Sequence, residues 1–558
     1  MKKIDIIEKK KIEKITDNSI INLVLTTINQ NKQILIFNNS KRSAEATAEK
    51  IANKINSVND NNNNKNELDN IASKILNTFQ NPTRQCKRLA KCVEKGIGFH
   101  HSGLVSRQRE LIEKGFKDGF IKVISSTPTL AAGLNLPAYK VIIKDYKRYS
   151  QRGFNDIPIL EYHQMSGRAG RPGKEKIGRA VLCVSNETEK ERIISKYIYG
   201  KPEEIISKLA VEPTLKMYIL SLISMDLINS EKEIKEFFSN TFYAKQYQDL
   251  DALNFNIFRI INILIDYKFI NQEDNYYIAT RLGKKISELY LNPDTANYFL
   301  EHFEKFSEIF NSKINYKYNI YSLIHFLTKS TEMKPLFRVL KAEEEIYSAK
   351  LDNIQEYLEI KYDPFEDDFS EYLSSLKTTD ILIDWINESP EDYTTEKYRI
   401  TPGELNYKVN IIDWLLYSLE EIAAMKKKIY FKNKLKQLRL RFKHGIKEEL
   451  VELISLSGIG RVRARKLFKN NIKTLNDIRE INLTELKELI PENIAKKIKI
   501  ELSSNIHELN LDTDKTPKEL KDRTLKEVSD IEVIDLIDNY NKFEKEKKEE
   551  QKKLLEYF

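Results

Sequence analysis

Short, uninterrupted apolar runs alternate with helical patterns between residues 19 and 190. The runs are ILIF (34–37), VI (123–124), VII (141–143) and AVLCV (180–184). Runs of this kind are typical of parallel strands covered on both faces of a sheet, because the side chains on both faces must avoid water. Ser40 follows the first run and can cap a helix whose apolar stripe is Ala44, Ala48, Ile51 and Ile55. The sequence therefore predicts an α/β domain built on a parallel sheet.

The length of 558 residues is too great for one core and favours three to five domains. Helical patterns followed by the strand-like YYIAT predict a winged helix, and a largely helical region comes next. The asparagine tract at 59–64 reads as a surface insertion in the α/β domain. The predicted segments are an N-terminal extension (1–18), the α/β domain (19–200), the winged helix (201–295), a helical bundle (296–440), a helix-hairpin-helix (441–505) and a charged, flexible tail (506–558).

Composition narrows the classes of function. The net charge is +9, and basic residues gather in 426–447 and 461–469, which favours a polyanionic partner. The three cysteines, Cys86, Cys92 and Cys183, form no CxxC pair, so no structural metal is expected. No run approaches the ~20 apolar residues that span a bilayer. We expect an intracellular, cytoplasmic protein.

The segment QMSGRAGRPG (164–173) carries the strongest chemical signal. Arg168 and Arg171 lie three residues apart, so both guanidinium groups can lie on one side of a turn, with Gln164 just before them. Such a pair can stabilise charge on a transferring γ-phosphoryl group. The alternative is a glycine-rich basic surface loop.

The segment STPTLAAG (126–133) predicts a short helix at a strand end. Thr127 is placed to cap it, Pro128 suits its first position, and Gly133 can end it in the left-handed conformation. The hydroxyls of Thr127 and Thr129, with free backbone N–H groups, could hold a nucleic-acid phosphate. A capped helix without a ligand is the alternative.

The segment LISLSGIGRVRARKLF (453–468) has the spacing of a helix-hairpin-helix. Gly458 and Gly460 let backbone N–H groups approach a phosphate, and Arg461 and Arg465 share a helical face, with Arg463 in the same basic run. Such binding would be independent of sequence and sensitive to salt. The alternative is a motif that serves packing alone.

The region 407–429 predicts an amphipathic helix with one off-core tryptophan. Its apolar arc is Ile411, Ile412, Leu415, Leu416, Leu419, Ile422 and Ala423. Trp414 lies roughly 130° from the centre of this arc, where a base could stack on it. Packing of Trp414 against a neighbouring domain is the alternative.

The chain ends in QKKLLEYF. Gln551, Leu554, Tyr557 and Phe558 match the QxxLxxYF pattern of a box that binds the sliding clamp PCNA. The alternative is a terminal helix that docks on its own domain.

Several segments together resemble motifs of the Ski-two-like superfamily-two helicases and, within them, the archaeal HelQ-like DNA repair helicases. The resemblance covers residues 19–500 and is carried by NNSKRSAEATA (38–48), GFHHSGL (98–104), STPTLAAGLNLP (126–137), QMSGRAGRPG (164–173), SELYLNP (287–293), IHFLTKSTEMKPL (324–336), YRITPGEL (398–405) and 438–468. It implies a second RecA-like domain, a winged helix, a helical ratchet and a helix-hairpin-helix. It also implies 3′–5′ translocation on single-stranded or forked DNA, in fork repair or recombination.

The resemblance also implies roles for individual residues. DNA contacts would come from Ser40, Lys41, Arg42 and His101, and ATP contacts from Gly133, Asn135 and Gly167. A structural role is the alternative for the adjacent His100 and His101. A strand-splitting hairpin would fall within 147–162, with Arg152 and Phe154 near its tip. Tyr407 stands where relatives tend to have an arginine, which puts a phosphate contact there in doubt.

One departure from the family pattern is that the sequence contains no GxxxxGK[ST] P-loop and no Asp-Glu Walker B box. ATP and Mg²⁺ would therefore be bound mainly by a first RecA-like domain that is not part of this sequence. We expect a separately encoded subunit to supply that domain; the alternative is that the chain is a fragment. Two other functions stay open, a non-catalytic DNA-binding adaptor recruited by the clamp and an RNA helicase subunit.

Overall fold

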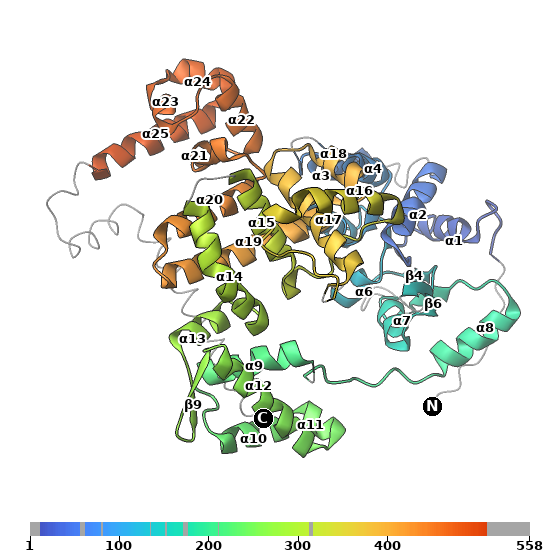
Figure 1. Ribbon diagram of the computed structural model, residues 1–558. Coiled ribbons are helices and arrows are strands. Elements are labelled where there is room, and N and C mark those ends of the chain that lie inside the picture. The colour runs from blue at the N-terminus through green and yellow to red at the C-terminus, as the bar shows by residue number, and fades with distance from the viewer. Residues whose placement is uncertain are drawn as a thin grey trace, which may run out of the picture. The chain divides into compact units, whose positions relative to one another are not determined.

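The computed structural model describes residues 12–55, 62–79, 82–133, 136–150, 153–170, 177–209, 211–311, 316–365 and 367–509. The chain divides into two compact units, Met1–Val451 and Glu452–Phe558 (Figure 1). Seven residues with predicted roles lie outside the described residues: Asn135, Arg152, Arg171, Gln551, Leu554, Tyr557 and Phe558.

A five-stranded parallel sheet forms the centre of the first domain. Its strand order is β2–β3–β1–β4–β7, and each pair of neighbours is parallel. The strands are β1 (Ile34–Phe37), β2 (Ile97–His100), β3 (Val123–Ser126), β4 (Lys140–Ile143) and β7 (Arg179–Leu182). The four apolar runs of the sequence are four of these strands, so the predicted parallel sheet is confirmed. Because β1, β3 and β4 are adjacent and parallel, the segments that leave their carboxyl ends converge at one edge.

Helices cover this sheet and bury one continuous core with it. They are α1 (Ser19–Ile28), α2 (Lys41–Lys54), α3 (Asn62–Leu76), α4 (Arg84–Val93), α5 (Ser106–Lys117), α6 (Thr129–Gly133), α7 (Ile159–Ser166) and α8 (Glu187–Ile193), the last extended by a π-helical turn, Ile194–Ile198. The stripe predicted on α2 is buried, and the Ser40 hydroxyl accepts a hydrogen bond from the Ser43 N–H at 3.2 Å. The asparagine tract is not wholly an insertion, because α3 begins at Asn62 and buries Leu68, Ile71, Ala72 and Ile75.

A small antiparallel hairpin lies between β4 and α7. Its strands are β5 (Lys147–Ser150) and β6 (Gly153–Asp156), and Lys147 pairs with Asp156. The backbone thus forms a hairpin where the family resemblance implied one. The side chain of Phe154 lies outside the described residues.

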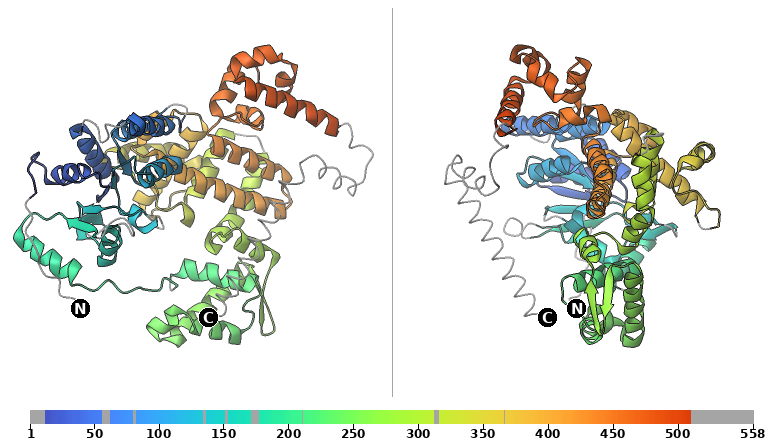
Figure 2. Two further views of the ribbon diagram at one scale, coloured as in Figure 1. Left: turned by 180° about the vertical axis from the view of Figure 1, so that it is seen from behind. Right: turned by 60° about the vertical axis from the view of Figure 1, so that its left-hand side comes forward.

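Helices and one two-stranded hairpin follow in the order expected of a winged helix. They are α9 (Glu212–Ser224), α10 (Glu231–Ser239), α11 (Phe242–Tyr247), α12 (Leu250–Asp266), β8 (Ile270–Glu273), β9 (Tyr276–Ala279) and α13 (Arg281–Glu288). The hairpin strands are seen together in Figure 2. Tyr277 and Ala279 of β9 are buried and their neighbours are exposed, as the alternation in YYIAT indicates.

The region after Pro293 is helical. Its α-helices are α14 (Pro293–Asn311), α15 (Tyr316–Thr328), α16 (Lys341–Ile354), α17 (Phe369–Ile386), α18 (Glu391–Tyr398), α19 (Pro402–Met425) and α20 (Ile429–His444), with 3₁₀ turns at Thr331–Met333, Gln355–Tyr357 and Glu448–Leu450. The longest of these helices, α19, packs side by side with α20 (Figure 2). All seven residues of the predicted α19 arc are buried, in a core shared with α9–α13.

The second unit is made of short helices: the end of α21 (Val451–Ile454), α22 (Arg461–Lys469), α23 (Leu475–Glu480), α24 (Leu483–Leu489) and α25 (Glu492–Leu509). Its buried residues include Ala464, Leu467, Ile478 and Ile498. In the described ranges, no helix combines the length and the apolar character needed to cross a bilayer.

Candidate nucleic-acid interface

A cavity of about 550 Å³ opens where the chain leaves β1 and β3. Its lining includes all five of the residues assigned to phosphate contacts in these two segments: Ser40, Lys41, Arg42, Thr127 and Thr129. They meet there because β1 and β3 are parallel neighbours, paired from Ile34–Val123 to Phe37–Ser126. The N-terminus of α2 also faces this edge, and the first amides of a helix carry partial positive charge. The cavity therefore has hydrogen-bond donors that suit an anion.

The wall formed by Thr127 and Thr129 differs in detail from the prediction. The two hydroxyl oxygens lie 2.9 Å apart and share a hydrogen bond, and α6 begins at Thr129 rather than after Thr127. The predicted left-handed stop at Gly133 is wrong, because Gly133 is the last residue of α6 and its φ is not positive. A side chain takes over part of the capping: an Arg168 Nη2–H donates to the Ala131 carbonyl at 2.5 Å.

A second cavity, of about 580 Å³, lies between the α/β domain and α19. Lys41 and Ser102 line both cavities, so the two are neighbours. Tyr407 lines the second cavity and is exposed. The next residue, Lys408, is buried; its ammonium donates to the Met333 carbonyl, and burial lowers its pKa to about 8.

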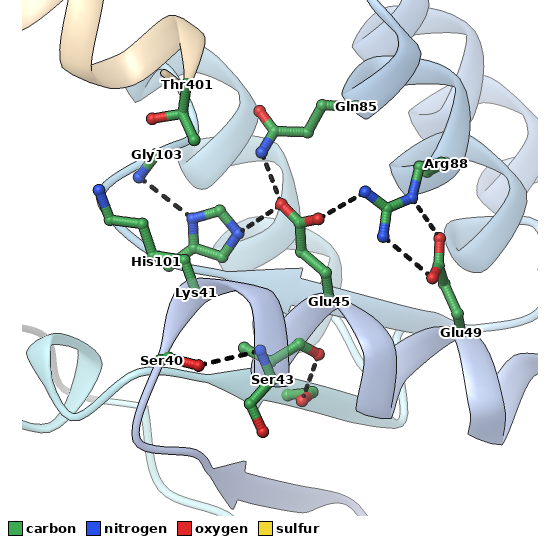
Figure 3. A network of polar contacts seen from close by, with 12 residues as sticks. Ser40, Lys41, Ser43, Glu45, Glu49, Gln85, Arg88, His101, Gly103 and Thr401 are labelled. Carbon is green, nitrogen blue, oxygen red and sulfur yellow. Dashed lines mark hydrogen bonds and ion pairs between the residues drawn. The ribbon is translucent and has the colours of Figure 1, made fainter. Parts of the chain in front are cut away.

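His101 belongs to a buried polar network rather than to a surface (Figure 3). Its side chain is 0% exposed, Nε2 lies 3.1 Å from a Glu45 carboxylate oxygen, and Nδ1 accepts the Gly103 N–H at 3.1 Å. The assignment of His101 as a direct DNA contact is therefore wrong in this structure, because neither ring nitrogen is free and the ring is out of reach. The His101 ring lies in the interior of the α/β domain, where it stacks on the ring of Phe99.

Glu45 is the centre of this network. Its carboxylate accepts hydrogen bonds from Gln85 Nε2 and Arg88 Nη1, each at 2.6 Å, and Arg88 in turn binds Glu49. Burial alone would raise the pKa of Glu45. The hydrogen bonds from His101 and Gln85 and the charges on His101 and Arg88 outweigh burial and hold this pKa below its usual value.

Arg168 stands just beyond the end of α7, next to α6. Gly167 is the residue that ends α7, and Gln164 is exposed on it. The Ala138 N–H donates to the Arg168 carbonyl at 2.9 Å, and the guanidinium binds the end of α6. These contacts bring Arg168 and Gly133 to one place, although 35 residues of sequence separate them.

Trp414 occupies the packed position that the sequence left open as an alternative. Its indole N–H donates to the Leu289 carbonyl at 3.0 Å, and the side chain is half-buried. Leu289 directly follows α13, so α19 uses Trp414 to contact the winged-helix region. Base stacking on the remaining exposed part of the ring stays a prediction.

The glycines of the second unit have the geometry that a close phosphate approach requires. Gly458 has φ +84°, the left-handed region where glycine is favoured, and Gly460 precedes α22 in extended conformation. Arg463 donates to the Gly458 carbonyl at 2.8 Å, and the Arg465 guanidinium lies 5.1 Å from the centre of the Phe468 ring. Arg461 is half-buried in the first turn of α22.

Sequence reasoning missed several residues that line the first two cavities, among them Arg148, Glu161 and Glu404. Glu404 had a local signal, because TPGE is a capping-box pattern, but nothing near it in the sequence identifies its partner. In the described part of the chain, no group of three or more His, Cys, Asp or Glu side chains is placed to hold a metal ion.

Three family models match the chain. The helicase conserved C-terminal domain matches residues 67–173, archaeal helicase domain 4 matches 321–445, and the SAM-like helix-hairpin-helix tandem matches 450–504. With the parallel sheet, the converging phosphate-contact residues and Arg168, these matches define the class: a Ski-two-like superfamily-two helicase chain with a RecA-like domain.

Comparison with individual proteins identifies the family. The ATP-dependent DNA helicase Hel308 of Methanococcus vannielii is 36% identical over 529 residues, covering 88% of this chain and 68% of the relative. The Hel308 proteins of Pyrococcus horikoshii (38% identical; 86% and 65% covered) and Methanocella arvoryzae (32%; 92% and 68%) are similar to it as well. The chain belongs to the Hel308 family. It spans about two thirds of the length of these relatives.

Proposed function

We propose that this chain is the nucleic-acid-gripping part of an ATP-dependent 3′–5′ DNA helicase that acts in replication-fork repair or recombination. The observation that carries the proposal is the cavity beside β1 and β3, where Lys41, Arg42 and two threonines from a distant segment meet. A cavity that holds the strand through its phosphates suits a motor that must step along any sequence. The relatives' name, ATP-dependent DNA helicase, favours DNA over RNA.

The ATP-hydrolysing site of this helicase is proposed to be shared between two polypeptides. The 558 residues contain Arg168 but no P-loop. The P-loop domain would hold ATP and Mg²⁺, and this chain would contribute Arg168 with Gln164, Gly133 and Gly167 nearby. The guanidinium uses one donor on the Ala131 carbonyl and has further donors for a phosphoryl oxygen. A separately encoded subunit would supply the P-loop.

The test is reconstitution. The full chain is used to capture a P-loop polypeptide from native extract, and ATP hydrolysis and unwinding of a 3′-tailed fork are measured for each component and for the mixture. Activity is expected only in the mixture. A mixture that is inert on forked DNA would overturn the helicase proposal, whereas brisk DNA-stimulated hydrolysis by the chain alone would overturn the two-polypeptide site.

A matched pair of variants separates the helicase from a DNA-binding adaptor. Arg168→Ala should abolish unwinding by the mixture and leave binding to single-stranded DNA intact. Arg192→Ala removes an exposed arginine that pairs with Asp156 on the same domain and should change neither. Unchanged function in Arg168→Ala would favour the adaptor, and equal competition by single-stranded RNA would favour an RNA helicase.

We also propose that Gln551, Leu554, Tyr557 and Phe558 bind the sliding clamp. The support is the QxxLxxYF pattern, in which one helical turn presents an aliphatic and two aromatic side chains. The double variant Tyr557→Ala, Phe558→Ala should lose binding to purified PCNA while keeping its affinity for single-stranded DNA. Retention of clamp binding by this variant would rule out the box.

A further inference from the structure

Two of the cations that line the first cavity are already paired with carboxylates. The Lys41 ammonium lies 2.6 Å from Glu404 Oε1, and the Arg148 guanidinium lies 3.0 Å from Glu161 Oε2. The Lys41 and Glu404 side chains are 32% and 38% exposed, so a dissolved anion can reach both. A phosphate that enters this cavity must therefore compete with an acid for each of these cations.

Glu404 is held in place by its own helix and does not depend on Lys41 for its position. Its second oxygen, Oε2, accepts the Thr401 N–H at 2.8 Å and the Thr401 hydroxyl at 2.7 Å, which is a capping box at the start of α19. Lys41, in contrast, reaches Glu404 on a flexible stem from the first turn of α2. Lys41 is therefore the partner that can change position.

The ion pair lies beside a second contact at a seam between the α/β domain and α19. In this second contact, the Gly403 N–H donates to the Gly103 carbonyl at 3.0 Å. A β-carbon on Gly403 would lie 2.4 Å from the Ser102 carbonyl oxygen, so the two backbones touch. The backbone contact leaves the seam closed if Lys41 departs, and the side-chain contact is the part that a phosphate can remove.

We propose that Glu404 is a positioning residue that holds the Lys41 ammonium in an ion pair until a nucleic-acid phosphate takes the place of the Glu404 carboxylate. It thereby sets the affinity of the cavity for the strand. This inference rests on the proposed function, because it assumes that the cavity binds a DNA phosphate. Glu161 forms a similar ion pair with Arg148, and both residues also line this cavity.

The decisive variant is Glu404→Gln, which removes the charge and keeps the cap, because glutamine also serves at this position of a capping box. Partly exposed ion pairs are weak, so binding of the full chain to oligo-thymidylate at low salt should tighten by about 1.5- to 5-fold. In the wild type, Glu404 must take up a salt cation when it loses Lys41, which offsets counterion release. The slope of log K against log salt should therefore be steeper in the variant, by up to about 0.7.

A double-mutant cycle shows whether Glu404 acts through Lys41. Lys41→Ala should weaken binding, and adding Glu404→Gln to it should produce no tightening. The control for net charge is Glu231→Gln, which breaks the Lys235–Glu231 pair on α10, outside both cavities, and should leave affinity and salt slope unchanged.

The outcomes separate this inference from the function on which it rests. If wild type binds oligo-thymidylate and Lys41→Ala weakens it, but Glu404→Gln equals wild type, the role of Glu404 is refuted and the proposed function stands. Tightening that persists in the Lys41→Ala background, or that Glu231→Gln reproduces, also refutes it. If the wild type does not bind the strand, the proposed function and this inference fail together.

Discussion

Replacing Glu45 with alanine should destabilise the α/β domain far more than the same change at Glu49. Both residues lie on α2, one helical turn apart, and both bind Arg88 (Figure 3). Glu45 also accepts hydrogen bonds from His101 and Gln85. The two variants therefore compare a buried network centre with a peripheral partner of the same type.

The magnitude follows from what each truncation leaves unpaired. The His101 side chain is 0% exposed in the structure, so removal of Glu45 leaves its Nε2 buried and without the partner that it has there. Arg88, in contrast, keeps its hydrogen bond to Glu49. Hydrogen bonds to charged groups contribute about 1.5–3 kcal/mol each, and a stranded buried group costs about 1–3 kcal/mol. We expect Glu45→Ala to lower the free energy of opening by about 2–4 kcal/mol. Glu49→Ala should lower it by less than about 1 kcal/mol, because that pair is about one third exposed.

Amide hydrogen exchange is the suitable assay. Both tryptophans, Trp385 and Trp414, lie outside the α/β domain, so their fluorescence does not report its unfolding. The amides of β2 and β3 do report it, and Glu45→Ala should accelerate their exchange by about 30- to 1,000-fold, at 1.36 kcal/mol per factor of ten. Equal exchange in the two variants, within about twofold, would refute the reasoning that the Glu45 network stabilises this domain.

Three further predictions concern catalysis, the seam and pH. In the reconstituted complex, Arg168→Ala should reduce the ATP hydrolysis rate by about 10³- to 10⁵-fold; a loss under tenfold would contradict a role at the γ-phosphate. Gly403→Ala should lower the melting temperature of the full chain, because its β-carbon would meet the Ser102 carbonyl 2.4 Å away and relief of such crowding costs about 1–3 kcal/mol; Gly133→Ala, with no atom within 4 Å, should not. The stabilising effect of Glu45 depends on its lowered pKa, so the exchange difference between wild type and Glu45→Ala should be full above the ordinary pKa of 4.5 and disappear as pH falls through the lower folded value; an undiminished difference in acid would show that the carboxylate charge is not involved.

The sequence predicted those features that depend on neighbours along the chain. The runs at 34–37 and 141–143 became buried strands, because three or four consecutive apolar residues need cover on both faces. The stripe on α2 and the arc on α19 became helix cores, because a period of 3.6 residues places such side chains on one face. Gly458 took positive φ at the turn where its motif requires it.

Local sequence patterns did not predict the structure correctly where a side chain could contact more than one partner. Strand β2 escaped notice because IGFH is short and half polar, yet both of its faces are buried between α2, α4 and α5. His101 sits in a motif beside a phosphate-binding edge, but Glu45 and Gly103 take both ring nitrogens. For Trp414, the angular position on the helix predicted only that the ring points away from the apolar arc. It did not identify what the ring contacts.

What the sequence by itself determined about this chain is most of its helices and strands and its parallel sheet, because periodicity and turn chemistry act over a few residues. What only the tertiary structure decided is which polar groups are already paired. Lys41 and Glu404 are 363 positions apart, and Trp414 and Leu289 are 125 apart. A hydrogen bond or ion pair forms only when packing brings two groups within about 3–4 Å, and that distance depends on how the whole chain folds.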